Sequence, residues 1–314
     1  MADADAGEGS MAATPPWPSG AAWIGGRYCP VEEAKISVLD LGVTRSDATY
    51  DVVHVWRRHF YRLDDHLDRF SASLARLRLD PGHDRAEIEA MLHGCVRLAG
   101  LREAYVSMTC TRGRVEAGRR DLRTARATFY CFAVPFVWII APDRQAAGGA
   151  HLWISQVTRI PPQSVDPLVK NYHWLDLDTA QLEAYDHDAE LVVLRGPSGA
   201  ITEGPGYNVF AHVDGRWLTP ASGTLQGITR RSVIEIAAEA GKPVQEGRLT
   251  AEDLRRADEV LITSTAGGIM PVTVINGEPV GTGKPGPLTA RLRDEYWRRQ
   301  EDPRFTTPVR YDEP

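Results

Sequence analysis

The chain has 314 residues, of which 43% are hydrophobic and 25% are charged. This composition is typical of a folded globular protein and excludes a disordered, collagen-like or coiled-coil chain. Its net charge is −6, and no basic stripe of the kind that binds nucleic acid is visible. The longest apolar stretch, 132–141, is too short to cross a bilayer. We therefore expect neither a nucleic acid nor a membrane among its partners.

Residues 1–20 are acidic and rich in Ala, Gly and Pro. They lack the basic start and apolar centre of a secretory signal, which predicts a flexible N-terminal arm and a cytoplasmic protein. The four cysteines are Cys29, Cys95, Cys110 and Cys131, and none of them forms a CxxC motif. We expect buried reduced thiols rather than disulfides or zinc ligands.

The pattern of strands and helices expected in residues 21–140 predicts a small N-terminal α/β domain. Two helices are expected in it, and apolar residues recur every three or four positions in each, as they do when one face packs on a sheet. The first helix begins at Leu63 with two acidic residues in its first turn. The expected elements are strands 22–24, 27–28 and 50–56, helices 63–77 and 85–98, and strands 103–111 and 128–136.

Residues 141–149, APDRQAAGG, have the composition of a linker, and we place the domain boundary there. The larger C-terminal domain is then 150–314. Mixed strands and helices in both halves predict two domains of α/β and α+β type. The expected elements are strand 152–157, helix 175–185, strands 191–194, 209–213 and 217–218, helix 232–240 capped by Gly241, a capping box from Thr250 to Asp253, strands 260–262 and 272–275, and a last helix from Pro287.

Lysine chemistry has only four candidates, because the other basic residues are arginines. Lys170 differs from Lys35, Lys242 and Lys284 because it follows Leu-Val and precedes Asn-Tyr-His-Trp. Apolar and aromatic surroundings lower the pKa of a lysine, which a Schiff-base lysine requires. The alternative is a lysine whose stem packs on aromatic rings while its amine reaches water, and context alone favours this alternative.

Two loops of small residues are candidates for binding a phosphate. Residues 225–230, LQGITR, lead directly into a predicted helix, whose N-terminal amides and dipole favour an anion. Thr229 would add a hydroxyl. Residues 264–268, STAGG, follow a predicted strand and have the same potential. Either loop alone is a weak signal, but the two loops together with one candidate lysine form a stronger one.

Glu203 lies in a glycine-rich turn, EGPGYNVF, at 203–210. A carboxylate facing a pyridinium nitrogen keeps that nitrogen protonated and makes the ring an electron sink. An exposed turn glutamate is the simpler interpretation of Glu203 taken alone. The chain has no HExxH motif, no GxSxG motif and no Rossmann fingerprint. We therefore expect no metal site, and hydrolase and dehydrogenase chemistry are disfavoured.

These pieces, in this order, resemble fold-type IV pyridoxal-phosphate (PLP) enzymes, and most closely the (R)-selective amine transaminases. The resemblance runs from residue 21 to about residue 297 and is specific because its segments occur together. It implies a two-domain fold of the D-amino-acid aminotransferase-like type, with PLP between a small and a larger domain, and a homodimer whose site borrows residues from the partner. The matching segments are GAAWI at 20–24, YDVVHVW at 50–56, RLDDHLDRF at 62–70, VKNYHW at 169–174, EGPGYNVF, LQGITR, and TSTAGG at 263–268.

The resemblance also assigns roles to single residues. Lys170 would hold PLP as a Schiff base and move the proton between the substrate's Cα and the cofactor's C4′. Glu203 would pair with the pyridinium nitrogen, and Arg69 would bind the phosphate as a charged fork. The remaining phosphate ligands would be the backbone of Ile228 and Thr229, together with Thr265.

The resemblance is looser for the residues that would select the substrate. An arginine on the loop after Thr111-Arg-Gly can hold a keto acid's carboxylate, and Arg120 is the candidate, with Arg119 beside it; a solvated basic loop is the alternative. Arg45 stands where the family usually has a histidine, and Ser107 where some members have a glutamate. If Arg45 points inward, its charge would favour amino acids or acid-bearing amines. The pocket positions that match the family in type are Tyr50, Val52, Tyr105, Trp174 and Ala266.

Together these features predict a PLP-dependent aminotransferase that moves an amino group from an amine of R configuration to a keto acid such as pyruvate by a ping-pong mechanism. A D-amino-acid or branched-chain aminotransferase is the alternative within the class. Weaker whole-chain similarity places an aminodeoxychorismate lyase behind both. A non-catalytic homologue is disfavoured because Lys170, Glu203 and Arg69 are all present.

Overall fold

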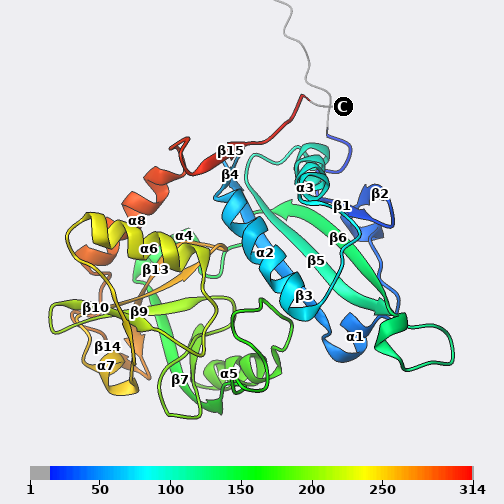
Figure 1. The fold of residues 1–314 in the computed structure, drawn as a ribbon. Helices are drawn as coiled ribbons and strands as arrows, with labels where there is room; N and C mark the ends of the chain where they lie inside the picture. The colour runs from blue at the N-terminus through cyan, green and yellow to red at the C-terminus, as the bar shows by residue number, and fades with distance from the viewer. Residues whose placement is uncertain (1–14, 313–314) are drawn as a thin grey trace, which may run out of the picture.

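The computed structural model of the chain describes residues 15–312. Its strands form two separate sheets, each covered by helices, and the expected mixture of α/β and α+β domains is confirmed (Figure 1). Residues 1–14 of the expected arm lie outside the described residues. The rest of the arm, 15–20, packs on the first domain, where the Trp17 amide donates to the Leu98 carbonyl at 3.3 Å.

The first sheet is antiparallel throughout and begins with a tight hairpin. Gly25 and Gly26 both have positive φ, as a two-residue hairpin turn requires, so this turn joins the two strands as expected. The strand order is β15 (Thr306–Pro308), β4 (His59–Tyr61), β3 (Ala48–Trp56), β5 (Ala104–Arg114), β6 (Arg126–Pro135), β1 (Ala21–Ile24) and β2 (Arg27–Pro30).

Two amphipathic helices, α2 (Leu63–Leu77) and α3 (Arg85–Ala99), pack on this sheet. The expected inward face of α2 is confirmed for Leu67, Phe70 and Leu74, which are buried in the core of the small domain. A capping box holds the start of α3. The short helix α1 (Leu41–Arg45) was not expected, because five residues give too little periodicity to mark a helix.

The second sheet is mixed and forms the larger domain. Its parallel pairs are β7 with β8, β7 with β13, and β10 with β11, and its other pairs are antiparallel. The strand order is β11 (Gln245–Gly247), β10 (Arg216–Pro220), β9 (Asn208–Val213), β12 (Glu259–Ser264), β13 (Gly268–Ile275), β7 (Ala150–Thr158) and β8 (Leu191–Arg195), with β14 (Glu278–Pro279) paired to β13.

Helices cover this sheet at several places. The helices α6 (Ile228–Glu239) and α8 (Pro287–Arg299) pack on β12 and β13, and α5 (Leu175–Asp186) packs on β7 and β8. The short α7 (Ala251–Arg255) begins with the expected capping box. Helix α6 starts four residues before the expected position, directly after Gly227. Among residues 15–312, no helix has the length and apolar character needed to span a membrane.

The domain boundary differs from the expected one in two places. The expected linker contains a short helix, α4 (Pro142–Ala147), which begins with Pro142. After α8 the chain returns to the first sheet, where β15 pairs with β4 and Val309 is buried in the small-domain core. The described residues after 305 therefore belong structurally to the small domain, in which β15 replaces β4 as the edge strand of the sheet.

Candidate active site

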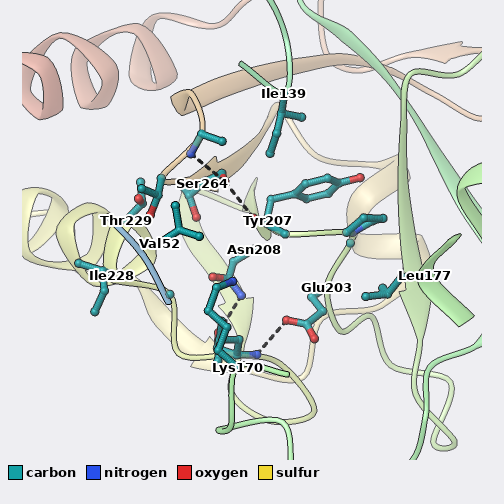
Figure 2. A pocket seen from close by; sticks show the side chains of 18 of the residues that line it. Val52, Ile139, Lys170, Leu177, Glu203, Tyr207, Asn208, Ile228, Thr229 and Ser264 are labelled. Atoms are coloured by element: carbon teal, nitrogen blue, oxygen red, sulfur yellow. Dashed lines mark hydrogen bonds between the residues drawn. The ribbon is translucent and has the colours of Figure 1, made fainter. Parts of the chain in front are cut away.

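A cavity of about 330 Å³ lies between the two domains. Figure 2 shows that its side chains come from both: Val52 belongs to β3 of the small domain, and Asn208 and Ser264 belong to β9 and β12 of the large one. Most of the residues that the sequence singled out line this cavity, namely Lys170, Arg69, Glu203, Ile228, Thr229, Thr265, Tyr50, Val52, Tyr105, Trp174 and Ala266.

Lys170 lies in the cavity and is anchored through its backbone to β3. Its carbonyl accepts hydrogen bonds from the Tyr50 amide at 3.1 Å and from Thr49 Oγ1 at 2.7 Å. Its Nζ lies 4.5 Å from the centre of the Tyr50 ring. Burial lowers the pKa of Lys170 to about 8, and the nearby Arg69 acts in the same direction. A lysine with this pKa is partly neutral near pH 7, and only a neutral amine is a nucleophile.

The segment after Lys170 is held against the small domain by aromatic side chains. Tyr172 stacks on Tyr50 with 4.2 Å between the ring centres, and its hydroxyl lies 3.2 Å from Thr109 Oγ1 of β5. The indole nitrogen of Trp174 donates to the Asn171 carbonyl at 3.1 Å. These contacts fix the backbone on the C-terminal side of Lys170.

Glu203 is buried, and both of its carboxylate oxygens have partners. Its Oε2 accepts from the Leu225 amide at 2.8 Å and from Thr224 Oγ1 at 3.0 Å. Its Oε1 faces the Arg159 guanidinium at 3.3 and 3.4 Å. Burial raises the pKa of Glu203, while Arg159 and then the Leu225 amide oppose this rise. The interpretation of Glu203 as an exposed turn residue is therefore wrong.

Arg159 is a cavity residue that the sequence did not single out. It lies directly after β7, is buried, and donates to both oxygens of Asp176. Its partners are 17 and 44 positions away in the sequence, so no local pattern connects them. A buried arginine is rarely left unpaired, but only the fold identifies Asp176 and Glu203 as its partners.

Arg69 projects from α2 into the cavity and is held by a buried carboxylate. Its Nε and Nη2 donate to the two oxygens of Asp51 at 2.7 and 2.8 Å. His66 Nδ1 lies 2.8 Å from the same carboxylate. Burial alone would raise the pKa of Asp51, but Arg69 and then His66 outweigh it and hold the pKa well below its usual range. The remaining nitrogen, Nη1, donates to the Gln226 carbonyl at 3.2 Å, beside the start of α6.

The N-terminus of α6 lies beside Arg69 and, with it, forms a candidate anion site. Gly227 is the N-cap, so no side chain caps the first turn, and the first-turn amides face outward from the helix. Asn208 Nδ2 donates to Thr224 Oγ1 at 2.7 Å and to the Leu225 carbonyl at 2.9 Å, which fixes the loop before the helix. A Cβ on residue 227 would lie 2.2 Å from Asn208 Oδ1, so only glycine fits there.

An ion pair between α2 and α6 holds the two sides of the anion site together. Arg62, just before α2, donates to the two Glu235 carboxylate oxygens at 2.7 and 3.0 Å and to Ser232 Oγ at 3.1 Å. The helix bearing Arg69 and the helix whose N-terminus faces it are therefore fixed relative to each other. PLP fits these residues. Its phosphate suits a site made of a guanidinium, a helix N-terminus and nearby threonine hydroxyls. Lys170 would bind its carbonyl carbon, and Glu203 would pair with its ring nitrogen.

Three expected substrate residues do not line the cavity of this chain. Ser107 is buried on β5, directly opposite Val52 in the sheet. Arg45 is exposed at the end of α1 and lines a neighbouring cavity of about 370 Å³ instead. Arg120 is exposed on the loop between β5 and β6, which extends away from the large domain (Figure 1). Arg119, on the same loop, pairs with Glu116. Arg45 therefore does not meet, within a single chain, the condition that its charge points into the cavity.

We expect Asp51→Asn to weaken PLP binding by about tenfold or more, because each hydrogen bond to a charged group contributes about 1.5–3 kcal/mol and Asp51 makes two to Arg69. The dissociation constant of PLP, measured by fluorescence quenching, checks this. Asp68→Asn is the matched control, because Asp68 lies on α2 in an exposed pair with Arg85. Pyridoxal, which lacks the phosphate, should bind both variants as it binds the native protein. Equal PLP affinity in Asp51→Asn and native protein would contradict the assignment of Arg69.

The sequence pattern of the family described as amino-transferase class IV matches residues 48–275. The putative branched-chain-amino-acid aminotransferase of Methanocaldococcus jannaschii is 29% identical over 276 residues, which cover 87% of this chain and 94% of that protein. The D-alanine aminotransferase of a Listeria monocytogenes strain is 31% identical over 271 residues, which cover 84% of this chain and 91% of that protein.

Solved structures of aminotransferases also resemble this chain. The branched-chain amino acid aminotransferase of T.th., crystallised with pyridoxamine 5′-phosphate, superposes with a TM-score of 0.85 at 30% sequence identity. The superposition covers 93% of this chain and 99% of that one. Another structure of that aminotransferase contains N-(5′-phosphopyridoxyl)-L-glutamate. The matched region spans most of the chain and includes both domains and the cavity between them. The chain therefore belongs to the amino-transferase class IV family and is a PLP-dependent transaminase of fold type IV.

Proposed function

We propose that this transaminase moves the amino group of an amine of R configuration to a keto acid such as pyruvate by a ping-pong mechanism. The observation that carries the proposal is the pairing of both arginines that line the cavity: Arg69 is held by Asp51, and Arg159 contacts Asp176 and Glu203. Among the described residues, no unpaired guanidinium lines the cavity to hold a donor's carboxylate. The R configuration rests on the sequence motifs that resemble the (R)-selective enzymes.

The walls around the reactive amine support an apolar donor. Tyr50, Val52 and Tyr105 line the cavity from β3 and β5, and Val137 and Ile139 line it from the connection between the domains. Aliphatic and aromatic side chains favour an aryl or alkyl group over a charged one, because a charge loses its solvation there without gaining a partner from the same chain. The carboxylate of the keto acid would therefore be held by a residue of the second copy proposed below.

PLP, when bound, supplies an electron sink for negative charge at the substrate carbon. In the proposed mechanism Lys170 Nζ would take the proton from the substrate's Cα as a general base and then deliver it to the cofactor's C4′ as a general acid. Its lowered pKa of about 8 suits both steps near neutral pH. Glu203 would pair with the ring nitrogen, while Arg69, Thr265 and the first-turn amides of Ile228 and Thr229 would hold the phosphate.

A branched-chain or D-amino-acid aminotransferase is the second candidate. The observation that favours it is the set of relatives, whose names are branched-chain-amino-acid and D-alanine aminotransferases. An amino acid brings a carboxylate, which would have to be held by hydroxyl and amide donors of the cavity or by residues of a second copy.

We also propose that the working unit is a homodimer. Val38 and Leu39, just before α1, and Val43, within it, are 79%, 68% and 56% exposed, and a cluster of exposed apolar side chains is typical of a protein interface. In such a dimer Arg120 is the residue that we expect to reach the cavity of the other copy. Light scattering should give twice the chain mass of 34.7 kDa. A monomer at micromolar concentration would contradict the proposal.

A cytoplasmic location is a further part of the proposal. All four cysteines are buried and free, and the sulfur atoms of Cys95 and Cys131 lie 3.8 Å apart without a bond. Neighbouring reduced thiols are typical of proteins from a reducing compartment.

The proposed donor class is tested by a half-reaction without a keto acid. The PLP-loaded enzyme is mixed separately with (R)-1-phenylethylamine, its S enantiomer, D-alanine and L-leucine, and the absorbance band of the lysine-bound cofactor is followed. We expect rapid loss of the band with the R amine and slow loss with the others. Fastest loss with an amino acid would replace the proposal by an amino-acid transaminase, and the handedness of that donor would name it. Lys170→Ala is the control, because it removes the amine that forms the band.

Arg45→His should leave the ranking of these donors unchanged within about twofold, because Arg45 is exposed and lines a different cavity from the reactive lysine. The same half-reaction rates measure this. A selective loss of activity towards D-alanine and L-leucine would instead show that Arg45 holds a substrate carboxylate, which a single chain does not allow and a second copy would have to explain.

A further inference from the structure

Arg159 is a buried charged residue with no part in the mechanism proposed above. We propose that Arg159 is a positioning residue for Glu203: clamped by Asp176, it fixes the orientation of the Glu203 carboxylate and keeps it ionised, so that the carboxylate is available to the ring nitrogen of PLP. This inference rests on the role proposed for Glu203 and adds two residues to the same site.

The guanidinium of Arg159 is divided between two carboxylates. Its Nη1 donates to Asp176 Oδ1 and Oδ2 at 3.0 and 2.8 Å, while Nε and Nη2 contact Glu203 Oε1 at 3.4 and 3.3 Å. Asp176 is itself held by the amides of Ile160 at 2.6 Å and Leu177 at 2.9 Å. The shorter contacts therefore anchor the arginine to Asp176, and the longer ones present a fixed positive charge to Glu203.

The second oxygen of Glu203 is held from the other side. Its Oε2 accepts from the Leu225 amide and from Thr224 Oγ1. With donors on both oxygens, the carboxylate cannot rotate about its Cγ–Cδ bond without breaking hydrogen bonds in a buried site, which is costly. The direction in which Glu203 faces the cavity is thus set by Arg159 on one edge and by residues 224–225 on the other.

The charges that face Glu203 come from three directions. Arg159 contacts it directly, Asp176 lies behind Arg159, and Lys170 acts on it through space across the cavity. Tyr207 also lines the cavity, but its hydroxyl is occupied by the backbone of Val192. Residues 224–225 bring hydrogen-bond donors but no ionisable group. Arg159 is thus the one cation in direct contact with Glu203 among the described residues.

The sign of the electrostatic effect follows from burial. Burial raises the pKa of Glu203, and the positive charge of Arg159 is the main opposing influence. Without that charge the carboxyl would bind a proton at higher pH. A neutral carboxyl no longer favours a protonated ring nitrogen, so function would be lost as the pH falls and regained as it rises.

The test compares Arg159→Gln, Arg159→Lys and Asp176→Asn with the native enzyme between pH 5.5 and 9. The readouts are the PLP dissociation constant, the absorbance spectrum of bound cofactor and the half-reaction rate. Each readout is plotted against pH, and its acid limb is the part that falls at low pH. Arg159→Gln should move this limb to higher pH by about one unit, which is a roughly tenfold loss of PLP affinity and half-reaction rate at pH 6 that recovers by pH 9. Arg159→Lys retains the cation and should move the limb much less.

Asp176→Asn should move the acid limb in the opposite direction, to lower pH, because it removes a negative charge and leaves Arg159 to act on Glu203 alone. A structural role for the pair predicts something else: equal losses in Arg159→Gln and Asp176→Asn that do not depend on pH. That result would overturn the inference. If Arg159→Gln does not fold, Asp176→Asn alone tests the inference. An acid limb in Asp176→Asn at the same pH as in the native enzyme also overturns the inference about Arg159.

Glu203→Gln separates this inference from the function on which it rests. If Glu203→Gln binds PLP and reacts as the native enzyme does, the proposed role of Glu203 is wrong and the inference is wrong with it. If Glu203→Gln is impaired but Arg159→Gln follows the native pH profile, only the inference about Arg159 is wrong.

Discussion

The buried ion pair between Asp51 and Arg69 is the interaction on which the site depends. Asp51 lies on β3 without exposure to solvent, and its carboxylate accepts from the two nitrogens, Nε and Nη2, of one edge of the Arg69 guanidinium. The same strand holds the carbonyl of Lys170 through Thr49 and Tyr50. One strand of the small domain therefore fixes both Arg69, the proposed phosphate ligand, and Lys170, the proposed Schiff-base lysine. The spacing between these two groups is set by β3 rather than by loops, which gives it the precision that covalent catalysis requires.

The large domain links the two ends of the cofactor site in a comparable way. Thr224 and Leu225 donate to Glu203, and Asn208 donates to the same two residues and determines that position 227 is glycine. The loop that holds the carboxylate is therefore continuous with the helix N-terminus that faces Arg69. A shift of the Glu203 carboxylate would therefore move the N-terminus of α6 through residues 224–227, and the reverse also holds. The site is a connected hydrogen-bonded network rather than a collection of independent ligands.

The sequence predicted what is encoded locally. Long periodic helices such as 63–77 were placed correctly, because periodicity acts over a few residues. Local context alone favoured a different interpretation of Lys170 and Glu203, and it was the resemblance of several separated motifs to one family that placed both in a shared site; both line the cavity. The sequence did not predict β15, because its partner strand lies about 245 positions earlier. It also did not single out Arg159, because the carboxylates that Arg159 contacts are brought near it only by folding. Nor could the sequence show which way Arg45 points, because it lies at the end of α1, and five residues give too little periodicity to mark a buried face.

The return of the chain to the small domain has a consequence for its biosynthesis. Strand β15 follows the entire large domain in the sequence, yet it covers the edge strand β4 of the first sheet. A ribosome delivers the chain from the N-terminus, so the small domain emerges first and keeps one sheet edge open throughout translation of the second domain. Open edges invite pairing with other chains. The half of the molecule that is made first is thus the last to be completed, and its protection from aggregation depends on residues that are still inside the ribosome.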